Sequence, residues 1–577
     1  MIQLDDDQQS VVDADMSAQI LVVAPPGAGK TWTAARRLFR LALAVEDNEA
    51  PLLALSFSRA AGLALSKELR QMGVGARVEV RTIDSWTTRV LAAMPMPRVD
   101  GGEQIEVSSL DYDGRILRAL ELQASGTFSM PAYSHIVVDE AQDIRGPRAL
   151  LVESMLQSSV TCGWTVLGDP AQAIFDFADL ESKHLFELVE PVQGVTKVEL
   201  KGSHRATSAD LLRIRARGAA LRERQPNVTD LESLWADFAS LRSMTVEDVL
   251  RAAPQYADGP STTAILVRDN ASLFALSMQL NGLGVDHEVA SGPSEKLVPR
   301  WVAEVFGAGG RVAEDELRSR LGAGVDADGV LSAVKTATRS GARLVDLGAL
   351  ADQFLIGRGP ELLMRPPLEP LTLSTVHRAK GLEFDKVIVS MQRKSNLIPA
   401  QLIEETKVLY VSMTRSKRQL FRMLQADTQG YSKVDPRTGR LVEYKFAGRG
   451  NPVPIRFELR PDDIDYFRPW DSVGSRLKQL ADIRPGEFVR LDLVNDAGIG
   501  PGFYEVRAET SGVLLGATRP SFCEHLAVLR RDGVRAFKGA RVAGQGALVL
   551  PSRTLPDGRR MVVAPVIRGM IETLEGR

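Results

Sequence analysis

Ala24-Pro25-Pro26-Gly27-Ala28-Gly29-Lys30-Thr31 joins an apolar strand candidate to a helix candidate. The strand candidate reads Ile-Leu-Val-Val at residues 20–23, and residues 31–43 are rich in Ala, Arg and Leu at helical spacing. Small residues in such a turn let backbone N–H groups surround phosphate oxygens at the N-terminus of a helix. The stretch therefore predicts a phosphate-binding loop, in which Ala24 stands where the usual pattern has glycine.

The residues at the end of this loop and a second acidic stretch predict ATP and Mg²⁺ as cofactors. Lys30 can reach the β and γ phosphates of a nucleotide, and Thr31 can offer its hydroxyl to Mg²⁺. Residues 135–138 form another strand candidate, which is followed by Asp139 and Glu140. Asp139 can hold the metal while Glu140 deprotonates an attacking water, as phosphoryl transfer to water requires.

Around the loop, short apolar runs alternate with helical stretches. This rhythm predicts an α/β fold with a parallel sheet. A second set of strand candidates predicts a second domain of similar kind, and the many Gly, Pro and short apolar runs after about residue 430 predict a β-rich module. The candidates are strands 20–23, 52–55, 136–138 and 165–167 with helices 31–43 and 59–69, then strands 264–267, 387–389 and a segment around Leu420.

Composition excludes several classes of protein. The chain has 577 residues, 44% hydrophobic and 25% charged, which is typical of a globular protein of several domains. No apolar run approaches the ~18 residues of a membrane span, and Asp5-Asp6-Asp7 stands where a signal peptide is basic, so neither a membrane partner nor secretion is expected. The two cysteines, Cys162 and Cys523, lie far apart, exclude a disulfide framework and suit the cytoplasm.

The charge is unevenly distributed along the chain. Residues 431–577 contain 24 Lys and Arg against 18 Asp and Glu, a net charge of +6. Because the whole chain has a net charge of −2, residues 1–430 have a net charge of −8. Any basic surface in this first part must therefore be local.

Several short motifs follow one another between about Leu4 and Leu420 in an order that resembles superfamily 1 DNA helicases of the UvrD/Rep/PcrA type. The string at 375–384 is the most specific of them. The motifs are Leu4-Asp5-Asp6-Asp7-Gln8, the loop at 24–31, Ser56-Phe57-Ser58-Arg59-Ala60-Ala61, Arg81-Thr82-Ile83-Asp84-Ser85, Asp139-Glu140-Ala141-Gln142-Asp143, residues 167–177, Ser203-His204-Arg205, residues 375–384 and residues 409–416.

The resemblance implies which residues bind the nucleotide. It places Gln8 on the adenine base and Glu383 toward the nucleotide, and it puts His204 where relatives stack a tyrosine on the nucleotide. Trp32, directly after the loop, is expected to pack rather than to stack near the adenine. The implied cofactor-binding residues are Gln8, Ala24, Pro25, Pro26, Gly27, Ala28, Gly29, Lys30, Thr31, His204 and Glu383, with Thr31 and Asp139 at the metal.

The resemblance also implies the catalytic groups. Gln172 senses the γ-phosphate, Arg205 contacts it, and Arg415 is the arginine finger, a group worth about 10³ to 10⁵ in rate in other nucleotide hydrolases. The implied catalytic residues are Lys30, Asp139, Glu140, Gln172, Arg205 and Arg415.

On the DNA side the resemblance implies contacts from Phe57, Thr82, Phe177 and His377. Stacking of bases on aromatic rings tolerates any sequence, and phosphate contacts have no sequence information. Sequence-independent binding of single-stranded DNA and of tailed duplex DNA is therefore expected. The family further implies movement in the 3′ to 5′ direction.

The family implies two RecA-like domains with inserted helical subdomains. The first is expected at 1–205, with a short insertion at about 88–130, and the second at 206–430, with a helical insertion at about 293–370. Residues 431–577 form the basic β-rich module. Because both insertions are short, strand separation is expected to be weak.

Three alternatives to a helicase remain open. The first is a translocase that strips proteins from DNA with little unwinding, and the second is an adaptor that uses ATP as a switch while its C-terminal module docks a protein partner. The third is a helicase-nuclease, because Asp435, Glu443 and Lys445 match the pattern of some metal-dependent nucleases. A hairpin around Pro436-Arg437-Thr438-Gly439 explains that pattern more simply.

Overall fold

The computed structural model of the chain divides into two compact units. Unit 1 comprises Met1–Arg242, Ala379–Val387 and Arg393–Arg422, and unit 2 comprises Ser243–Arg378, Ile388–Gln392 and Met423–Arg577. The structure describes all residues except 1–3, 47–49, 58, 76, 94–109, 128–129, 158–161, 175–182, 203, 205–207, 258–260, 286, 291–296, 322–326, 342, 356–358, 365–370, 424–430, 436, 439, 446–452, 468–478, 495–502, 529–533, 551–558 and 575–577.

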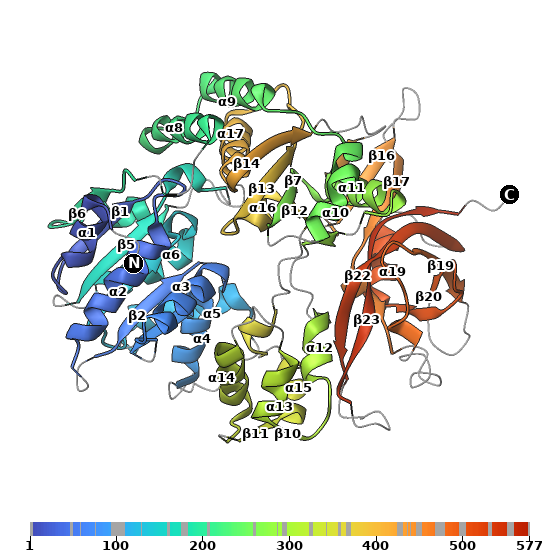
Figure 1. The fold of residues 1–577 in the computed structure, drawn as a ribbon, viewed down its shortest axis with the longest axis horizontal. Coiled ribbons are helices and arrows are strands. Elements are labelled where there is room, and N and C mark those ends of the chain that lie inside the picture. Colours follow the sequence, from blue (N-terminus) through green and yellow to red (C-terminus); the bar gives the residue numbers. More distant parts are fainter. Residues whose placement is uncertain are drawn as a thin grey trace. The chain divides into compact units, whose positions relative to one another are not determined.

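Unit 1 is built on a six-stranded parallel sheet with the strand order β3-β2-β4-β5-β1-β6 (Figure 1). The predicted strands of the first third are all present, each extended by up to three residues, so the α/β class with a parallel sheet is confirmed. The strands are β1 (Gln19–Val23), β2 (Leu52–Ser56), β3 (Val78–Thr82), β4 (His135–Asp139), β5 (Gly163–Gly168) and β6 (Thr196–Glu199).

Helices cover both faces of this sheet, so its central strands are apolar throughout. In β1, Ile20 and Val22 belong to one buried cluster, whereas Leu21 and Val23 belong to the other. This alternation follows from the two-residue period of a strand. The first face packs against α1 (Asp6–Asp13), α2 (Lys30–Ala44) and α3 (Arg59–Gln71), and the second against α4 (Ile83–Ala93), α5 (Tyr112–Ala124), α6 (Gly146–Gln157) and α7 (Leu185–Val189).

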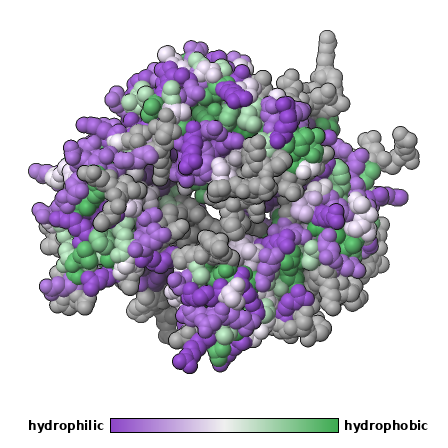
Figure 2. All heavy atoms as spheres, in the orientation of Figure 1, coloured by the Kyte–Doolittle hydropathy of each residue, from purple (hydrophilic) through white to green (hydrophobic). Residues whose placement is uncertain are grey.

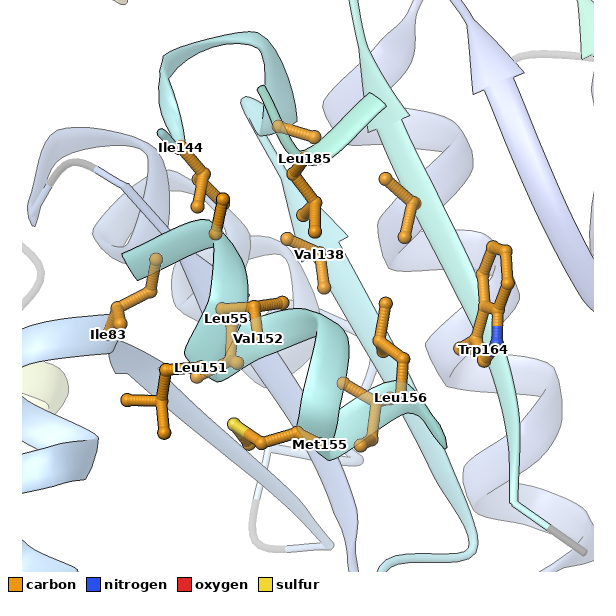
Figure 3. Packing of buried hydrophobic residues seen from close by; sticks show 14 of the residues in the cluster. Leu55, Ile83, Val138, Ile144, Leu151, Val152, Met155, Leu156, Trp164 and Leu185 are labelled. Carbon is orange, nitrogen blue, oxygen red and sulfur yellow. The ribbon is translucent and has the colours of Figure 1, made fainter. Parts of the chain in front are cut away.

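Figure 3 shows the second face from close by. Val138 and Trp164 project from neighbouring strands toward α6, which presents Val152, Met155 and Leu156 to them. All five side chains are at most 2% exposed. This packing fixes β4 and β5 side by side, and both strands end at the candidate site described below.

Unit 1 also contains three helices that pack on one another: α8 (Ala209–Glu223), α9 (Val228–Ser240) and α17 (Pro399–Met413). Two of them, α8 and α17, contact the short turn η3 (Pro170–Gln172) that follows β5. The predicted strands at 387–389 and around Leu420 are β13 (Phe384–Ser390) and β14 (Ser416–Met423).

Unit 2 contains three parallel strands. β12 (Leu371–Thr375) pairs with β7 (Thr263–Val267) on one side and with β8 (Glu288–Val289) on the other. The predicted strand at 264–267 is therefore confirmed. The helices that accompany these strands are α10 (Val246–Ala257), α11 (Asn270–Gly282) and α16 (Val376–Ala379).

The segment predicted as a helical insertion is helical. A short antiparallel pair, β10 (Arg311–Ala313) and β11 (Leu344–Asp346), interrupts it. Its helices are α12 (Arg300–Phe306), α13 (Glu314–Arg320), α14 (Ala327–Thr338) and α15 (Leu347–Leu355), followed by the turn η5 (Glu361–Met364).

Residues after 430 are rich in strands and are called the C-terminal module here. The helical insertion adds a strand to the sheet of this module. The strand β9 (Leu297–Pro299) pairs antiparallel with β22, and Ala547, Val549 and Met561 of the module lie in the buried cluster of the insertion. The sheet order is β15-β16-β17-β23-β22-β19-β20-β21-β18. The module comprises β15 (Tyr431–Val434), β16 (Leu441–Lys445), β17 (Val453–Leu459), η6 (Pro461–Asp463), β18 (Ile464–Asp465), β19 (Phe488–Val494), β20 (Phe503–Ala508), β21 (Leu514–Thr518), α19 (Pro520–Val528), β22 (Ala536–Val549) and β23 (Met561–Thr573).

The nuclease-like pattern lies in a hairpin, as the simpler interpretation predicts. β15 and β16 pair antiparallel, and Asp435 between them accepts hydrogen bonds from the N–H groups of Arg437 (3.0 Å) and Thr438 (3.1 Å). Glu443 lies 3.6 Å from the Nη1 atom of Arg456. Asp435 therefore orders a turn and Glu443 is ion-paired. In the described parts of the chain, no group of three or more His, Cys, Asp and Glu side chains could hold a metal ion.

Apolar residues are interspersed with hydrophilic ones on the face drawn in Figure 2. Large exposed hydrophobic side chains, such as Leu43 and Ile398, come from separate elements. No helix among the described residues combines the length and the apolar character that crossing a bilayer requires.

The stability of the C-terminal module depends on a buried ion pair. Arg440 donates from Nη1 to Asp463 Oδ2 (2.7 Å) and from Nη2 to Asp463 Oδ1 (2.5 Å), and both side chains are at most 5% exposed. Asp463→Asn leaves a buried guanidinium without its counter-charge, so we expect unfolding of unit 2 to become easier by about 3–5 kcal/mol. The control Asp492→Asn removes the exposed partner of Arg490 and should change stability by less than about 1 kcal/mol. Calorimetric unfolding of both variants checks this, and equal effects would contradict it.

Candidate functional site

Three neighbouring strands of unit 1 end at the candidate site. β4, β5 and β1 are adjacent and parallel, so their carboxyl ends lie at one edge of the sheet, where ligands bind in open α/β sheets. The loop at 24–31 follows β1, Glu140 follows β4, and Asp169 follows β5. The Ala24 N–H donates to the Gly168 carbonyl (2.9 Å), which ties the first loop to the end of β5.

Two glycines give the phosphate-binding loop its shape. Gly27 has φ 75° and Gly29 has φ 79°, in the left-handed region that favours glycine. The Ala28 N–H donates to the Pro25 carbonyl (3.1 Å), and α2 opens with a bond from the Thr33 N–H to the Gly29 carbonyl (2.8 Å). Ala24 lies outside the left-handed region, so the alanine at this position causes no strain.

The predicted catalytic groups meet at this loop. Lys30 Nζ lies 2.8 Å from Glu140 Oε2, and Thr31 Oγ1 donates to Asp139 Oδ2 (3.4 Å). Glu140 has φ 57°, an uncommon conformation for a residue other than glycine, and its N–H donates to Asp139 Oδ1 (2.8 Å). A hydroxyl and a carboxylate at this position are the hard oxygen ligands that Mg²⁺ prefers.

Burial and neighbouring charges shift the pKa values of the two adjacent carboxyl groups, Asp139 and Glu140, in opposite directions. Burial raises the pKa of Asp139 to about 6, against the opposing effect of the Lys30 charge. Burial also works to raise the pKa of Glu140, but the charges of Lys30 and Lys380 and the hydrogen bonds of Lys30 and Gln142 outweigh it and hold that pKa at about 2. Glu140 is therefore the carboxylate that stays ionised, as a general base must.

The predicted base-binding residues lie against the same loop. Gln8 Nε2 donates to the Ala28 carbonyl (2.9 Å) and lies 3.2 Å from His204 Nε2. Asp5 Oδ2 is 3.0 Å from that same ring nitrogen. The His204 N–H donates to the Gly27 carbonyl (3.0 Å), so His204 is attached to the loop through its backbone.

The predicted arginine finger contacts the predicted γ-phosphate sensor. Arg415 Nη2 donates to Gln172 Oε1 (2.6 Å), and Gln172 Nε2 donates to Asp169 Oδ2 (2.8 Å). Arg415 is 5% exposed, and burial lowers its pKa. Both polar ends of the Gln172 amide are thus oriented by ionic partners.

Three further residues complete this network. Lys380 Nζ donates to Asp143 Oδ1 and to the Gln172 carbonyl, while burial raises the pKa of Asp143 to about 6. Lys380 and Asp143 both lie within sequence motifs named above. Their positions in those motifs could therefore have identified them as site residues. Arg222 of α8 lies 3.8 Å from Asp169 Oδ1 and had no signal in the sequence.

Two family models match the chain. The AAA domain matches residues 8–178, and the UvrD-like helicase C-terminal domain matches residues 363–426. The first contains the phosphate-binding loop, Glu140 and Gln172, and the second contains Lys380 and Arg415. The second matched region is thus similar to UvrD-like helicases.

The relatives carry helicase names. ATP-dependent DNA helicase UvrD2 of Mycobacterium tuberculosis is 25% identical over 405 residues, which cover 58% of this chain and 56% of the relative. DNA helicase IV of Escherichia coli is 30% identical over 108 residues, 19% of this chain and 15% of the relative. The chain thus spans about half the length of its mycobacterial relative. A crystal structure of Pif1 helicase from Bacteroides aligns with 73% of this chain and 92% of that one, at 14% identity and a TM-score of 0.34.

For the remaining predicted site residues, the structure shows packing and backbone contacts rather than contacts within the network. Glu383 is half-buried and precedes Phe384, whose N–H donates to the Arg415 carbonyl (3.1 Å). Trp32 is half-buried, and the guanidinium carbon of Arg36 lies 4.3 Å from the Trp32 ring centroid. The predicted contacts Arg205 and Phe177 lie outside the described residues.

Two of the predicted DNA contacts also have packing roles. Phe57 is half-buried and packs against the buried cluster under α4 to α7. Thr82 is 9% exposed, and its Oγ1 accepts a hydrogen bond from the Ser85 N–H (3.2 Å) at the start of α4. His377 is half-buried on α16 in unit 2.

Gly29 offers a test of the geometry of the loop. A Cβ atom at Gly29 would lie 2.6 Å from Gln8 Nε2, whereas a Cβ atom at Gly73, which has the same φ of 79°, would meet nothing within 4 Å. Each alanine substitution should destabilise its unit by about 1 kcal/mol through backbone strain. Only Gly29→Ala should also weaken binding of a fluorescent ATP analogue, because it displaces Gln8. Equal affinities of Gly29→Ala and Gly73→Ala would contradict this account.

Proposed function

We propose that the chain is an ATP- and Mg²⁺-dependent DNA helicase or translocase that moves 3′ to 5′ on single-stranded DNA. The contact between Arg415 and Gln172 supports this proposal most directly. A finger joined to the sensor is the arrangement that a working nucleotide hydrolase requires, since both groups must reach the γ-phosphate together. The helicase names of the relatives support the choice of DNA as the second substrate.

Each group at the loop has a role in ATP hydrolysis. Lys30 exchanges Glu140 for the β and γ phosphates when nucleotide binds. Glu140, held ionised, then accepts a proton from the attacking water. Thr31 and Asp139 would hold Mg²⁺, which supplies positive charge to the phosphate oxygens when it is bound. Gln172 and Arg415 stabilise the negative charge of the transition state.

Recognition of the nucleotide base falls to Gln8 and His204. Gln8 is held by Ala28 and can present its amide to an adenine edge, and the imidazole of His204 offers a flat surface for stacking. Arg205 is proposed to contact the γ-phosphate, and Glu383 is proposed to face the nucleotide. Gln8 and His204 both contact the phosphate-binding loop. Binding of the base is therefore expected to depend on binding of the phosphates.

Two RecA-like domains, 1–205 and 206–430, with insertions at about 88–130 and 293–370, are proposed to grip one DNA strand alternately. Phe57, Thr82, Phe177 and His377 are the proposed contacts to the strand. Because such contacts ignore sequence, the substrate would be single-stranded or tailed duplex DNA of any sequence. The β-rich residues 431–577 are proposed to offer a surface to a protein partner.

Glu140→Gln tests the enzymatic half of the proposal. The change removes the general base while keeping a side chain of the same size, so we expect DNA-stimulated ATP hydrolysis to fall by roughly 10²- to 10⁴-fold with ATP binding retained. Steady-state hydrolysis with and without single-stranded DNA measures this. Hydrolysis by the wild-type chain that does not respond to DNA would instead support an ATP-switched adaptor.

Tailed duplexes test the direction of movement. We expect ATP-driven unwinding of a duplex with a 3′ single-stranded tail and little unwinding of one with a 5′ tail, because a 3′ to 5′ motor loaded on the tail runs into the duplex only from the 3′ side. Fluorescence unquenching of the separated strands reports it. Preference for the 5′ tail refutes the proposed polarity, and protein displacement without unwinding selects the translocase.

A further inference from the structure

Gln142 is a buried glutamine whose side-chain amide contacts two parts of the candidate site. It lies in the turn η2 (Ala141–Asp143) directly after Glu140, and it is 2% exposed. Its Nε2 donates to Glu140 Oε2, and its Oε1 accepts a hydrogen bond from the Asp169 N–H (3.0 Å). One amide therefore joins the residue that follows β4 to the residue that follows β5.

The backbone of the turn η2 is anchored in the core of unit 1. The Asp143 N–H donates to the Glu140 carbonyl (3.0 Å). The Ile144 N–H donates to the Ala141 carbonyl (3.2 Å), so both bonds join residues three apart, as in a 3₁₀ turn. Ala141 and Ile144 lie in the buried cluster under α4 to α7. The turn thus holds Gln142 beside its two partners.

The end of β5 approaches the amide closely because residue 168 is glycine. A Cβ atom at Gly168 would lie 2.5 Å from Gln142 Oε1 and 2.6 Å from Cε2 of Phe186 on α7. Both distances are too short for a non-bonded contact, so a side chain at this position would displace the amide or the ring. The glycine therefore allows the next residue, Asp169, to donate its N–H to Gln142.

Asp169 extends this connection to the predicted γ-phosphate sensor. Its Oδ2 accepts a hydrogen bond from Gln172 Nε2 (2.8 Å), and its Oδ1 accepts one from the Ala171 N–H (3.1 Å). Gln142, Asp169 and Gln172 are at most 6% exposed. Hydrogen bonds therefore connect the proposed general base to the proposed sensor through two buried residues.

Binding of ATP would make Gln142 more important for the orientation of Glu140. Lys30 Nζ lies 2.8 Å from Glu140 Oε2, the same oxygen to which Gln142 donates. In the proposed function, Lys30 leaves this carboxylate for the phosphates. Of the two side chains that contact Oε2, Gln142 then remains, and Glu140 Oε1 can accept the proton of the attacking water.

We propose that Gln142 is a positioning residue of ATP hydrolysis, which orients Glu140 according to the position of Gln172. The inference rests on the proposed function, in which Glu140 is the general base and Gln172 the sensor. A base must lie within hydrogen-bonding reach of the water that it deprotonates. Because one amide contacts both Glu140 and Asp169, a displacement of the sensor turn displaces the amide and the base with it.

Gln142→Met tests the proposal, because methionine is also unbranched but can make neither hydrogen bond. We expect kcat for DNA-stimulated ATP hydrolysis to fall roughly 10- to 100-fold, since a misplaced catalytic group costs about this much. KM for ATP should change by less than about 2-fold, because Lys30 and Thr31 are unaltered. The control Gln123→Met removes the hydrogen bond from Ser154 Oγ (2.8 Å) in the same unit and should change neither constant. An unchanged kcat in Gln142→Met would overturn the proposal.

Double variants separate positioning from partial unfolding. If Gln142 acts through Glu140, adding Gln142→Met to Glu140→Gln should lower single-turnover hydrolysis no further. Adding Gln142→Met to Gln172→Leu should lower it by a smaller factor than in the wild type. A chain that is partly unfolded would instead show factors that multiply, and multiplication in either pair would overturn the proposal.

A second variant and the wild type complete the test. If circular dichroism shows that Gln142→Met is unfolded, Gln142→Asn takes its place, because asparagine keeps a buried amide but is one methylene too short to contact both partners. The same results are then expected. If the wild-type chain does not hydrolyse ATP, or Glu140→Gln hydrolyses it at the wild-type rate, the proposed function itself fails. If Glu140→Gln is inactive while Gln142→Met and Gln142→Asn are fully active, the role of Gln142 alone is refuted.

Discussion

Parallel pairing of β4, β5 and β1 is the constraint on which the candidate site depends. Because the three strands run in one direction side by side, the loop at 24–31, the Asp139-Glu140 pair and the Asp169–Gln172 turn open at one edge. Antiparallel insertion of any one strand would carry its loop to the opposite edge, about five residues away at ~3.3 Å each. Apolar packing on both faces of the sheet enforces this direction. The packing that forms the core of unit 1 therefore also positions the residues of the candidate site.

The sequence reveals the site where function requires particular residue types at fixed spacing. The glycines Gly27 and Gly29, the lysine and hydroxyl beside them and the paired acids after an apolar strand are local patterns, which a single sequence displays without a structure. Gln172 and Arg415 are 243 residues apart, and only the family resemblance connected them. Arg222 belongs to no pattern, because its place beside Asp169 follows from how α8 packs.

The same contrast applies to residues after 430. Frequent glycine and short apolar runs predict strands, since both are local properties of the chain. The partner of a strand is a long-range property, and the pairing of β9 with β22 joins residues about 250 positions apart. Phe57 and Thr82 illustrate a further limit: a motif indicates that a residue type matters, but it does not distinguish a surface contact from a packing role.

The strand β9 of the insertion is part of the C-terminal sheet, and this affects where the gene can be divided. Composition indicates a boundary at residue 430, yet a cut there would separate β9 from its neighbour β22 and uncover the apolar side chains of Val298, Val302 and Phe306. The insertion would then lose Ala547, Val549 and Met561 from its core, and the module would lose Leu297 from its own. The insertion and the module therefore form one structural unit. Recombination between genes can exchange this unit only as a whole.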